Sequence, residues 1–588
     1  MVDASDIIAR ARAALDRGDP FAAYDIAAED DGSAGPELAY IRVLTLARLG
    51  DWHTALARYD AEGLDRLGDV DSLALKARLL KDKAFDAGVA ERKGILREAR
   101  DAYLAAFERT GDDFAAINAA SLSFMIGDKA EAEQLSSTLL EHSEDRATRT
   151  YWAQATRAEA LAILGRFDEA AATLEAAARL PDAKAAARSS TFLQIRRLLA
   201  SDSAIGGEIA DTLLRPIRPR RVAHFCGSMF LAGDPAEDSL AASVREAIRA
   251  EDIGIAFGAL ACGADIVIAE QALALGVELH AVFPFDRDDF VQQSVVNGGE
   301  AWRDRFERCA EAATGTYLAS RMRFVSDDEQ FAFGSRTAMG MARLRAAQLN
   351  AETVQLAVCD QDAEPGIAGT AADMATWRAS GGRTHRLSTM GVRRPQRPPT
   401  GARRASDREA RALRVLMFAD FQGFSHLPEP AIPRFWQTIM AACAATLSRH
   451  GEAVLAANTW GDGLHLVFDS VERAAAALTD LGQTLAGLDL AELGGIHGGM
   501  RIAAHFGSVY EMVDPVTGRS NYYGSEVSRA ARLEAITPPG KVYISEPMAA
   551  AIEMACADHY RSRYVGRIEL PKNFGVERIY SLELRRPA

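Results

Sequence analysis

Asp420 follows a run of residues with the pattern of a β-strand, and Asp462 separates two such runs. Residues 415–419 are all apolar, so a strand here would carry Asp420 at its end. Two short strand-like runs within residues 455–468 meet at Gly461-Asp462-Gly463, which predicts a tight hairpin. A strand end beside a hairpin tip can place two carboxylates within bridging distance of a pair of Mg²⁺ ions. The pattern therefore predicts a sheet that brings these two segments together.

Such a pair of ions would suit chemistry at phosphorus. Magnesium prefers a few hard oxygen ligands together with water and phosphate, and two ions can hold both the attacking and the leaving oxygen of a displacement. Taken singly, each aspartate also has an ordinary structural role. Asp462 would then be a turn residue that tolerates left-handed backbone, and Asp420 a strand-end acid.

Further motifs surround the two aspartates. They are Phe-Ala-Asp-Phe-Gln-Gly-Phe at 418–424, Gly-Asp at 461–462, Arg-Ile-Ala-Ala-His-Phe-Gly at 501–507, Gly-Ser-Glu-Val-Ser-Arg-Ala-Ala-Arg-Leu-Glu at 524–534 and Pro-Gly-Lys-Val-Tyr-Ile-Ser at 539–545. In this order the motifs resemble the catalytic domain of the class III nucleotidyl (adenylate/guanylate) cyclases. The resemblance covers residues 412–588 and implies a ferredoxin-like α+β fold.

The resemblance also implies a reaction. The 3′-hydroxyl of a nucleoside triphosphate attacks its own α-phosphorus and releases pyrophosphate and a 3′,5′-cyclic nucleotide, which needs positioning and charge neutralisation more than covalent help. The implied metal ligands are Asp420 and Asp462, which would hold two Mg²⁺ or Mn²⁺ ions. Arg532 would stabilise charge at the α-phosphate, a task that suits a planar guanidinium.

Other positions are assigned to substrate binding by the same resemblance: Phe421, Gly423, Phe424 and Lys572. The alignment at Lys572 is loose, and a solvated loop lysine is the alternative. The segment 507–523 fits an arm that crosses to a second subunit, or else a plain surface hairpin. Because family members build each site from two subunits, one catalytic domain in the chain implies a symmetric homodimer.

Three positions depart from the family pattern. Ser528 replaces an asparagine that orients the ribose, so it would act through water or a closer backbone. Asn458 and Asn521 replace the base-reading lysine and aspartate, and two amides can donate to and accept from either base edge. ATP is the expected substrate, with GTP or a pyrimidine triphosphate as alternatives. A further alternative is a catalytically inactive cyclase fold that acts as a dimeriser, nucleotide sensor or signalling scaffold.

The composition limits the other functions that the chain can have. A formal net charge of −15 argues against a nucleic-acid partner, which needs a concentrated basic face. The basic cluster within residues 389–411 is proline-rich and reads as a linker. The six cysteines are scattered without a Cys-x-x-Cys pair, which is typical of reduced thiols. With no signal peptide or long apolar run, we expect a cytoplasmic protein without a membrane partner.

Residues 1–213 are rich in Ala and Leu and contain a recurring Gly phrase. It starts at Gly18, Gly50, Gly127 and Gly165, with gaps of 32, 77 and 38 residues, so the longest gap is expected to hide a degenerate copy. The period resembles that of tetratricopeptide repeats. Stacked helix pairs form a concave surface, so we expect an all-α sensor that binds a protein partner or forms a dimer. A generic helical bundle is the alternative.

Residues 219–388 alternate strands with helices, which predicts a parallel doubly wound sheet. Glycines at strand ends suit phosphate or nucleotide binding. The candidate contacts for this second ligand site are Gly227, Ser228, Gly258, Gly263 and Glu270. On these residues the segment resembles the Rossmann-like SLOG superfamily (DprA/Lonely Guy-type), which implies a nucleotide-like ligand. The glycines could instead serve only the tight strand-to-helix turns.

These segments together predict a regulated signalling enzyme with a helical repeat domain, a Rossmann-like domain, a linker and a cyclase domain. Non-enzymatic scaffolding is the competing hypothesis. A third hypothesis places the chemistry in the Rossmann-like domain, as a nucleotide-cleaving effector.

Overall fold

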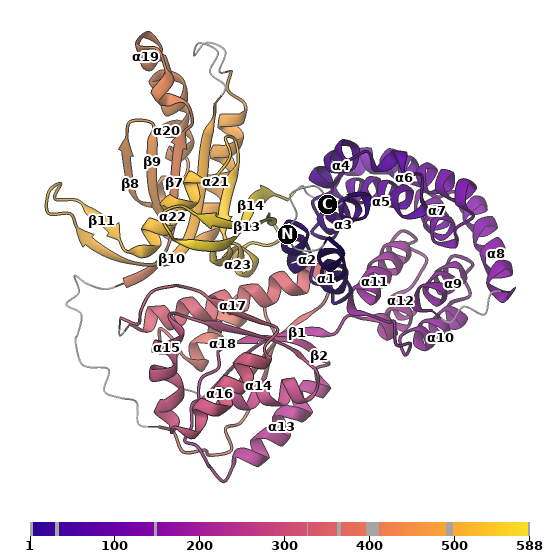
Figure 1. Cartoon of the computed structure of the whole chain (residues 1–588), viewed down its shortest axis with the longest axis horizontal. Coiled ribbons are helices and arrows are strands. Elements are labelled where there is room, and N and C mark those ends of the chain that lie inside the picture. Colours follow the sequence, from indigo (N-terminus) through magenta and orange to yellow (C-terminus); the bar gives the residue numbers. More distant parts are fainter. Residues whose placement is uncertain are drawn as a thin grey trace. The chain divides into compact units, whose positions relative to one another are not determined.

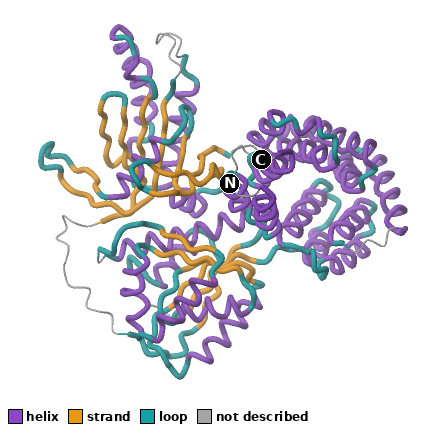
Figure 2. Tube along the Cα trace, in the orientation of Figure 1, coloured by secondary structure: helices purple, strands orange, loops and turns teal. Residues whose placement is uncertain are grey.

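The computed structural model describes residues 4–29, 35–145, 150–325, 327–360, 366–395, 411–489 and 498–585. The chain divides into two compact units. One contains Met1–Pro219 with Ala347–Ala351, and the other contains Arg220–Ala346 with Glu352–Arg585. Figure 1 labels most of the elements, and Figure 2 shows that the first part of the chain is helical and that strands occur only after it.

The first part of the chain, here called the helical unit, is a succession of helix pairs. Its helices are α1 (Ala4–Asp16), α2 (Pro20–Ala27), α3 (Gly35–Arg48), α4 (Trp52–Ala61), α5 (Val70–Asp86), α6 (Val89–Thr110), α7 (Asp113–Ile126), α8 (Lys129–Asp145), α9 (Tyr151–Ile163), α10 (Phe167–Ala177), α11 (Ala185–Ala200) and α12 (Gly207–Leu214). Each odd-numbered helix packs against the even-numbered helix that follows it. The helical region expected from the sequence is therefore present.

The recurring glycine phrase has a clear local cause. Gly18 and Gly50 adopt left-handed backbone, with φ of 73° and 78°, just after a helix has ended. The aspartate that follows each glycine caps the next helix: Asp19 accepts from the amide of Ala22, and Asp51 from the amide of Thr54. In these two phrases glycine stops one helix and aspartate starts the next. In the fourth phrase Gly165 is also left-handed, with φ of 74°, but Arg166 follows it and its side chain makes no capping bond.

The gap of 77 residues between two phrases holds one more pair, α5 and α6. Its turn runs through Ala87 and Gly88, and the backbone there is extended rather than left-handed. A turn of this kind does not need the Gly-Asp phrase, which explains why the copy is degenerate in sequence. At the far end of the unit, α11 packs against α7 and α9 and also against α1.

The middle domain, residues 220–395, is built on a parallel sheet of order β4-β3-β2-β1-β5-β6. Its strands are β1 (Arg221–Gly227), β2 (Ile253–Gly258), β3 (Glu278–Phe283), β4 (Gly315–Leu318), β5 (Thr353–Val358) and β6 (Thr384–Leu387). Its helices are α13 (Glu237–Ala250), α14 (Ala264–Ala274), α15 (Arg287–Phe290), α16 (Ala301–Ala312), α17 (Asp328–Leu349) and α18 (Thr370–Ala379). The strand order reverses between β1 and β5, and the sheet agrees with the parallel architecture expected from the sequence.

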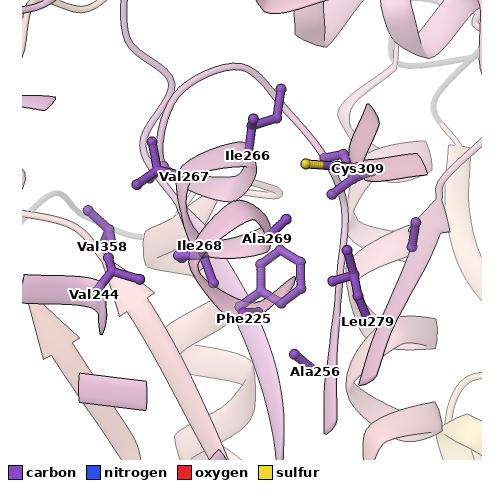
Figure 3. Packing of buried hydrophobic residues seen from close by; sticks show 14 of the residues in the cluster. Phe225, Val244, Ala256, Ile266, Val267, Ile268, Ala269, Leu279, Cys309 and Val358 are labelled. Atoms are coloured by element: carbon purple, nitrogen blue, oxygen red, sulfur yellow. The ribbon is translucent and has the colours of Figure 1, made fainter. Parts of the chain in front are cut away.

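The core of the middle domain lies between the sheet and its helices (Figure 3). Phe225 of β1 and Leu279 of β3 are buried against Ile268 and Ala269 of α14, with Cys309 of α16 in the same cluster. All strands of this sheet except the edge strands β4 and β6 are largely buried, which explains their near-continuous apolar runs. The SLOG-like assignment itself remains a prediction from the sequence.

The C-terminal domain, residues 411–585, contains a mixed sheet of order β13-β14-β12-β10-β7-β9-β8, with β11 paired to β10. Its strands are β7 (Arg411–Phe421), β8 (Val454–Trp460), β9 (Gly463–Phe468), β10 (Met500–Val513), β11 (Ser520–Tyr523), β12 (Val542–Ser545), β13 (Tyr560–Leu570) and β14 (Gly575–Leu584). Its helices are α19 (Ile432–Phe435), α20 (Ala441–Ser448), α21 (Val471–Ala486), α22 (Ser525–Ala535) and α23 (Glu546–Ala555). Among the described residues of this sheet, only β10 and β12 pair in parallel.

Part of the stretch that the sequence suggests as a linker packs on the middle domain. The Thr389 amide donates to Asp360, and the Arg393 amide donates to Asp234. Val392 lies in the core of that domain. Strand β7 begins at Arg411, and residues 396–410 lie outside the described part of the chain.

Candidate active site

The mixed sheet places Asp420 and Asp462 side by side. Asp420 is the penultimate residue of β7, and Asp462 lies in the turn that joins β8 to β9. Strand β7 pairs with β9 up to Ala419 opposite Leu464, so the end of one strand meets the start of the other. The hairpin and the strand end predicted from the sequence are both present.

The two carboxylates are close enough to influence each other. Burial raises the pKa of Asp462, and the charge and hydrogen bond of Asp420 raise it further. The amide of Phe421 opposes this shift by donating to Asp462. Two acids that repel each other at a strand end form a fitting site for divalent cations, because Mg²⁺ takes one or two carboxylates beside phosphate oxygens. Within the described residues, no group of three or more metal-binding side chains converges.

Arg501 of β10 supplies positive charge to this site. It lies opposite Asp420 in the β7–β10 ladder, and its Nη2 forms an ion pair with Asp420 Oδ2. Its Nε lies 2.9 Å from Oε1 of Glu534, near the end of α22. Burial and the charges of Asp420 and Asp462 raise the pKa of Glu534 to about 7, although Arg501 opposes the shift. The sequence motifs contain both Arg501 and Glu534, but nothing in their spacing shows that they meet.

Asn458 and Asn521 meet although they are 63 positions apart. Asn458 Nδ2 donates to Asn521 Oδ1 at 3.2 Å, and the same oxygen accepts from the Tyr522 amide. The Nδ1 atom of His465 lies 3.4 Å from the Nδ2 atom of Asn458. The His465 ring stacks on the Phe418 ring, with the two centroids 4.4 Å apart. Burial lowers the pKa of His465 to about 4, so it is neutral at physiological pH. Sequence reasoning missed this histidine.

Helix α22 carries Ser528 and Arg532 one turn apart, on the same face. The Arg532 guanidinium lies over the Phe574 ring at 5.9 Å, and its Nε is buried without a hydrogen-bond partner in the described residues. A buried, unpaired N–H is costly unless a ligand accepts from it. Lys572 is exposed in the turn between β13 and β14, in left-handed backbone with φ of 61°.

The aromatic residues next to Asp420 serve mainly to hold the strand end. Phe421 and Phe424 pack on Phe435 of α19, with ring centroids 5.1 and 4.9 Å apart. Gly423 adopts left-handed backbone with φ of 99°, which lets the chain turn between the two rings. Of these three predicted substrate contacts, Phe421 is buried.

A buried charge network anchors the first turns of α22. Glu526 is 3% exposed; its Oε2 lies 2.7 Å from His505 Nε2, and its Oε1 accepts from Ser320 of the middle domain at 2.5 Å. Burial opposes ionisation of Glu526, but Arg529, His505 and Ser320 outweigh it and lower the pKa of Glu526 to about 2. Arg529 donates to the Ala319 carbonyl at 3.0 Å.

The network also explains the glycine of the 501–507 motif without reference to substrate. A Cβ at Gly507 would lie 2.8 Å from His505 Nε2 and 2.9 Å from Glu526 Cβ. No side chain fits there. The glycine of the 501–507 motif is thus required for β10 to pass close beneath α22.

In the middle domain, the predicted ligand contacts cluster at the ends of β1 and β2 and in the approach to α14. Two of them have structural roles. Glu270 is held by Arg305 in two contacts, of 2.8 and 2.6 Å. A Cβ at Gly263 would lie 2.5 Å from the Phe230 amide nitrogen.

The surroundings of Gly227 and Gly258 likewise leave no room for a side chain. A Cβ at Gly227 would lie 2.3 Å from Ala264 Cβ, and one at Gly258 would lie 2.6 Å from the Phe225 carbonyl. Ser228 donates its amide to the Val358 carbonyl of β5. The nucleotide-like ligand of this region remains a prediction.

Two buried acids that the sequence analysis did not consider lie near the same edge. Burial raises the pKa of Asp265, whose Oδ1 has no partner in the described residues, and raises the pKa of Asp373 to about 7. They lie in the first turns of α14 and α18, where acidic residues are common. The sequence therefore gives no sign that these two are buried.

Residues 413–583 match the family model of the adenylate and guanylate cyclase catalytic domain. Residues 9–123 match the model described as Tetratricopeptide Repeats-Sensor. The cyclase match includes both aspartates and all of α22. Class III cyclase domains use divalent metal ions, in agreement with the carboxylate pair. None of the curated proteins matches the sequence significantly.

Several solved cyclase domains are similar to this one. The adenylyl cyclase CyaB of P. aeruginosa is 19% identical and covers 30% of this chain and 97% of its own, with a TM-score of 0.27. The guanylate cyclase domain of RhGC from Catenaria anguillulae in complex with GTP is 19% identical and covers 30% and 100%, with a TM-score of 0.26. The dimeric guanylyl cyclase domain of RhoGC from Blastocladiella emersonii is 19% identical and covers 30% and 99%, with a TM-score of 0.26.

None of the described helices combines the length and apolar character that a membrane crossing requires.

Proposed function

We propose that the chain is a nucleotidyl cyclase that converts ATP to 3′,5′-cyclic AMP and pyrophosphate, under the control of its helical unit and middle domain. The observation that carries the proposal is the pair Asp420 and Asp462, two carboxylates in mutual contact inside a domain that matches the cyclase model. Two Mg²⁺ or Mn²⁺ ions held there would neutralise the phosphates and polarise the reacting oxygens. The rest of the chemistry belongs to side chains of the chain itself.

Arg532 is the proposed partner of the α-phosphate. Its buried, unpaired Nε and its planar fork suit an oxygen on which charge accumulates in the transition state. Ser528 stands one turn earlier on the same helix face and would orient the ribose through its hydroxyl, directly or through water. The 3′-oxygen then bonds to the α-phosphorus as the bond to pyrophosphate breaks.

The direction of Arg532 supports a site shared between two copies of the chain. Glu534 is the α22 residue that approaches Asp420 of its own chain, through Arg501. Arg532 is two positions away, about 200° around the helix, and so faces away from these aspartates. We therefore infer that Arg532 serves the aspartates of a partner copy in a homodimer.

The hairpin of β10 and β11 supports the same assembly. Its turn is built by Asp514, which accepts from the amides of Val516 and Thr517. Val513 and Val516 are 65% and 92% exposed. Apolar side chains at an exposed tip fit an arm that a second subunit covers.

The amide pair supports the choice of base. Asn458 Nδ2 donates to Asn521 Oδ1, so the acceptor of Asn458 and the donor of Asn521 are the groups left for a ligand. An acceptor beside a donor complements N6 and N1 of adenine, and equally N4 and N3 of cytosine. Guanine and uracil present the reverse order. ATP is the proposed substrate, and CTP is its closest competitor.

Product analysis by mass spectrometry tests the proposal. The purified chain is incubated separately with ATP, GTP, CTP and UTP, each with Mg²⁺ or Mn²⁺, beside an Asp420→Asn control. We expect cyclic AMP that is absent from the control. A different cyclic nucleotide would correct the base, whereas no cyclic product from any triphosphate, with a folded dimer, would favour the non-enzymatic scaffold.

A further inference from the structure

The inner helices of the helical unit bring polar side chains together from distant parts of its sequence. Helices α5, α7, α9 and α11 are the first helices of successive pairs, and α11 packs against both α7 and α9 (Figure 1). Lys81 of α5 donates to Asn118 Oδ1 of α7 at 2.8 Å and to Gln194 Oε1 of α11 at 3.1 Å. Gln194 donates in turn to Glu159 of α9 at 2.8 Å.

Lys81 is unusual because its hydrogen-bond partners are neutral. The residue is only 9% exposed, yet both of its acceptors, Asn118 Oδ1 and Gln194 Oε1, are amide oxygens rather than carboxylates. Burial lowers the pKa of Lys81 to about 8, and Asp82 and Glu159 oppose this only from a distance. A buried ammonium without a direct counter-ion is costly, so a site for an anion beside it would relieve that cost.

Three arginines lie close to Lys81 or to one another: Arg48, Arg78 and Arg197. Arg78 and Arg197 share a single carboxylate, Asp82, at 3.6 and 3.8 Å. Burial and then Arg78 lower the pKa of Arg48 to about 10, although Tyr40 and Asp16 oppose the shift. Arg48 Nε is buried without a hydrogen-bond partner in the described residues. This gathering of cations occurs in a chain with a net charge of −15.

Aromatic rings hold two of the cations in place. The Lys81 Nζ lies 5.7 Å from the Tyr103 ring centroid, and the Arg197 guanidinium lies 3.8 Å from that of Phe85. Such contacts fix the direction of a cation without neutralising it. The rings therefore position Lys81 and Arg197 and leave their charges in place.

We propose that the inner face of the helical unit binds a small phosphorylated molecule, with Arg48, Arg78, Lys81 and Arg197 as its cationic contacts. Guanidinium groups match phosphate oxygens in bidentate pairs, and the lysine adds a point charge. Lys81 lies among four helices, so a small ligand reaches it more readily than the surface of a folded protein. The helical unit would then respond to a metabolite rather than only to a protein partner.

The test is hydrogen–deuterium exchange on the full chain, with and without AMP or inorganic phosphate, neither of which the cyclase site can cyclise. We expect slower exchange in residues 70–86 and 185–200. The variants Lys81→Met and Arg197→Gln should weaken this protection by about tenfold or more in ligand concentration, since each removes a charged hydrogen bond. Lys76→Gln, on the same helix but over the Tyr59 ring, is the matched control and should bind normally.

Arg197 is partly exposed, so its variant tests the site even where Lys81→Met unfolds; circular dichroism checks the fold of both. The proposal is overturned if neither probe slows exchange in the helical unit, or if the protection is confined to residues 411–585. It is also overturned if Lys81→Met and Arg197→Gln are protected as strongly as the wild-type chain. Protection by an acidic peptide alone would also overturn it in favour of a protein partner. None of these outcomes depends on cyclase activity.

Discussion

The Ser320 hydroxyl donates to Glu526 at 2.5 Å, so a residue just after β4 of the middle domain holds the helix that carries Ser528 and Arg532. Glu526 is buried and ionised, and the bond to Ser320 is therefore a charge-assisted contact. Movement of the segment that follows β4 would reach α22 through this one hydrogen bond. This contact offers a direct route by which the middle domain would control the proposed cyclase reaction.

Ser320→Ala should loosen α22 and lower cyclase activity several-fold, with a loss of stability of roughly 1–3 kcal/mol, because Glu526 loses a hydrogen bond in a buried place. Steady-state kinetics and thermal unfolding measure the two effects. Ser239→Ala, at an exposed position in α13, is the control. Wild-type kinetics together with a wild-type melting temperature in Ser320→Ala would show that the contact carries no coupling.

Two inactive variants should complement each other if sites are shared between copies. Asp420→Asn would remove a ligand of the proposed metal pair, and Arg532→Ala would remove the proposed α-phosphate contact, so each homodimer should be inactive. In a mixture, subunit exchange produces heterodimers in which one site keeps both groups. We expect activity to recover towards a quarter of the wild-type level, as half of the dimers would hold one intact site of two.

The recovery is measured as cyclic nucleotide formed after co-incubation, with the two variants co-expressed as a second route to mixing. Mixing Asp420→Asn with Asp462→Asn is the control, because both changes affect the same half of the site. A mixture of Asp420→Asn and Arg532→Ala that stays as inactive as this control would place the whole site in one chain.

Asn458→Glu should shift the base preference. An ionised carboxylate only accepts hydrogen bonds, so it favours the N1 and N2 donors of guanine and disfavours N1 of adenine, an acceptor. The ratio of kcat/KM for GTP to that for ATP is expected to rise by about tenfold, in line with 1–3 kcal/mol for one base contact. Competition assays with both triphosphates give this ratio directly. An unchanged ratio would mean that the amide pair does not contact the base.

The stability of the middle domain should fall as the pH rises from about 4 to about 7. Burial raises the pKa of Asp373 from 3.8 to about 7, so the folded state keeps a proton that the unfolded state has released. The folded state binds more protons in this window, and stability therefore decreases with pH there and levels off above it. The shift corresponds to at most about 4 kcal/mol.

Asp373→Asn removes the titration and keeps a group that can bond to Ser335. We expect the variant to melt higher than wild type at pH 8, and the difference to shrink towards pH 4. Calorimetry across this range measures both. Asp238→Asn, at an exposed position, should follow the wild-type curve throughout. A constant difference between Asp373→Asn and wild type at all pH values would contradict the prediction.

The sequence was most informative where chemistry and local geometry coincide. Asp420 and Asp462 stand at a strand end and a hairpin tip, and both features follow from residue patterns a few positions long. The glycine and aspartate of the first two helical phrases are likewise a stop and a start signal that can be predicted locally.

The contacts that tune the site could not be predicted in the same way. Ser320 and Glu526 are 206 positions apart, and Arg501 meets Glu534 only because β10 passes beneath α22. The protonation of Glu534 and Asp373 depends on how deeply tertiary packing buries them. Patterns of residues that are close together in the sequence predict neither these long-range contacts nor the protonation of the two acids. The meeting of Asn458 with Asn521 depends in the same way on the pairing of β11 with β10.

The contact between α1 and α11 affects how the helical unit tolerates shortening. In an open solenoid the outermost repeat needs a polar outer surface, and repeats can be trimmed from either end at a local cost. Here the first and the last long helices contact each other, and Ile7, Ala11 and Leu15 of α1 are buried in a cluster with residues of α2 and α3. Deleting α1 would expose the apolar residues of α2 and α3 and would also remove the contact with α11, so we expect such a truncation to aggregate rather than to yield a smaller soluble array.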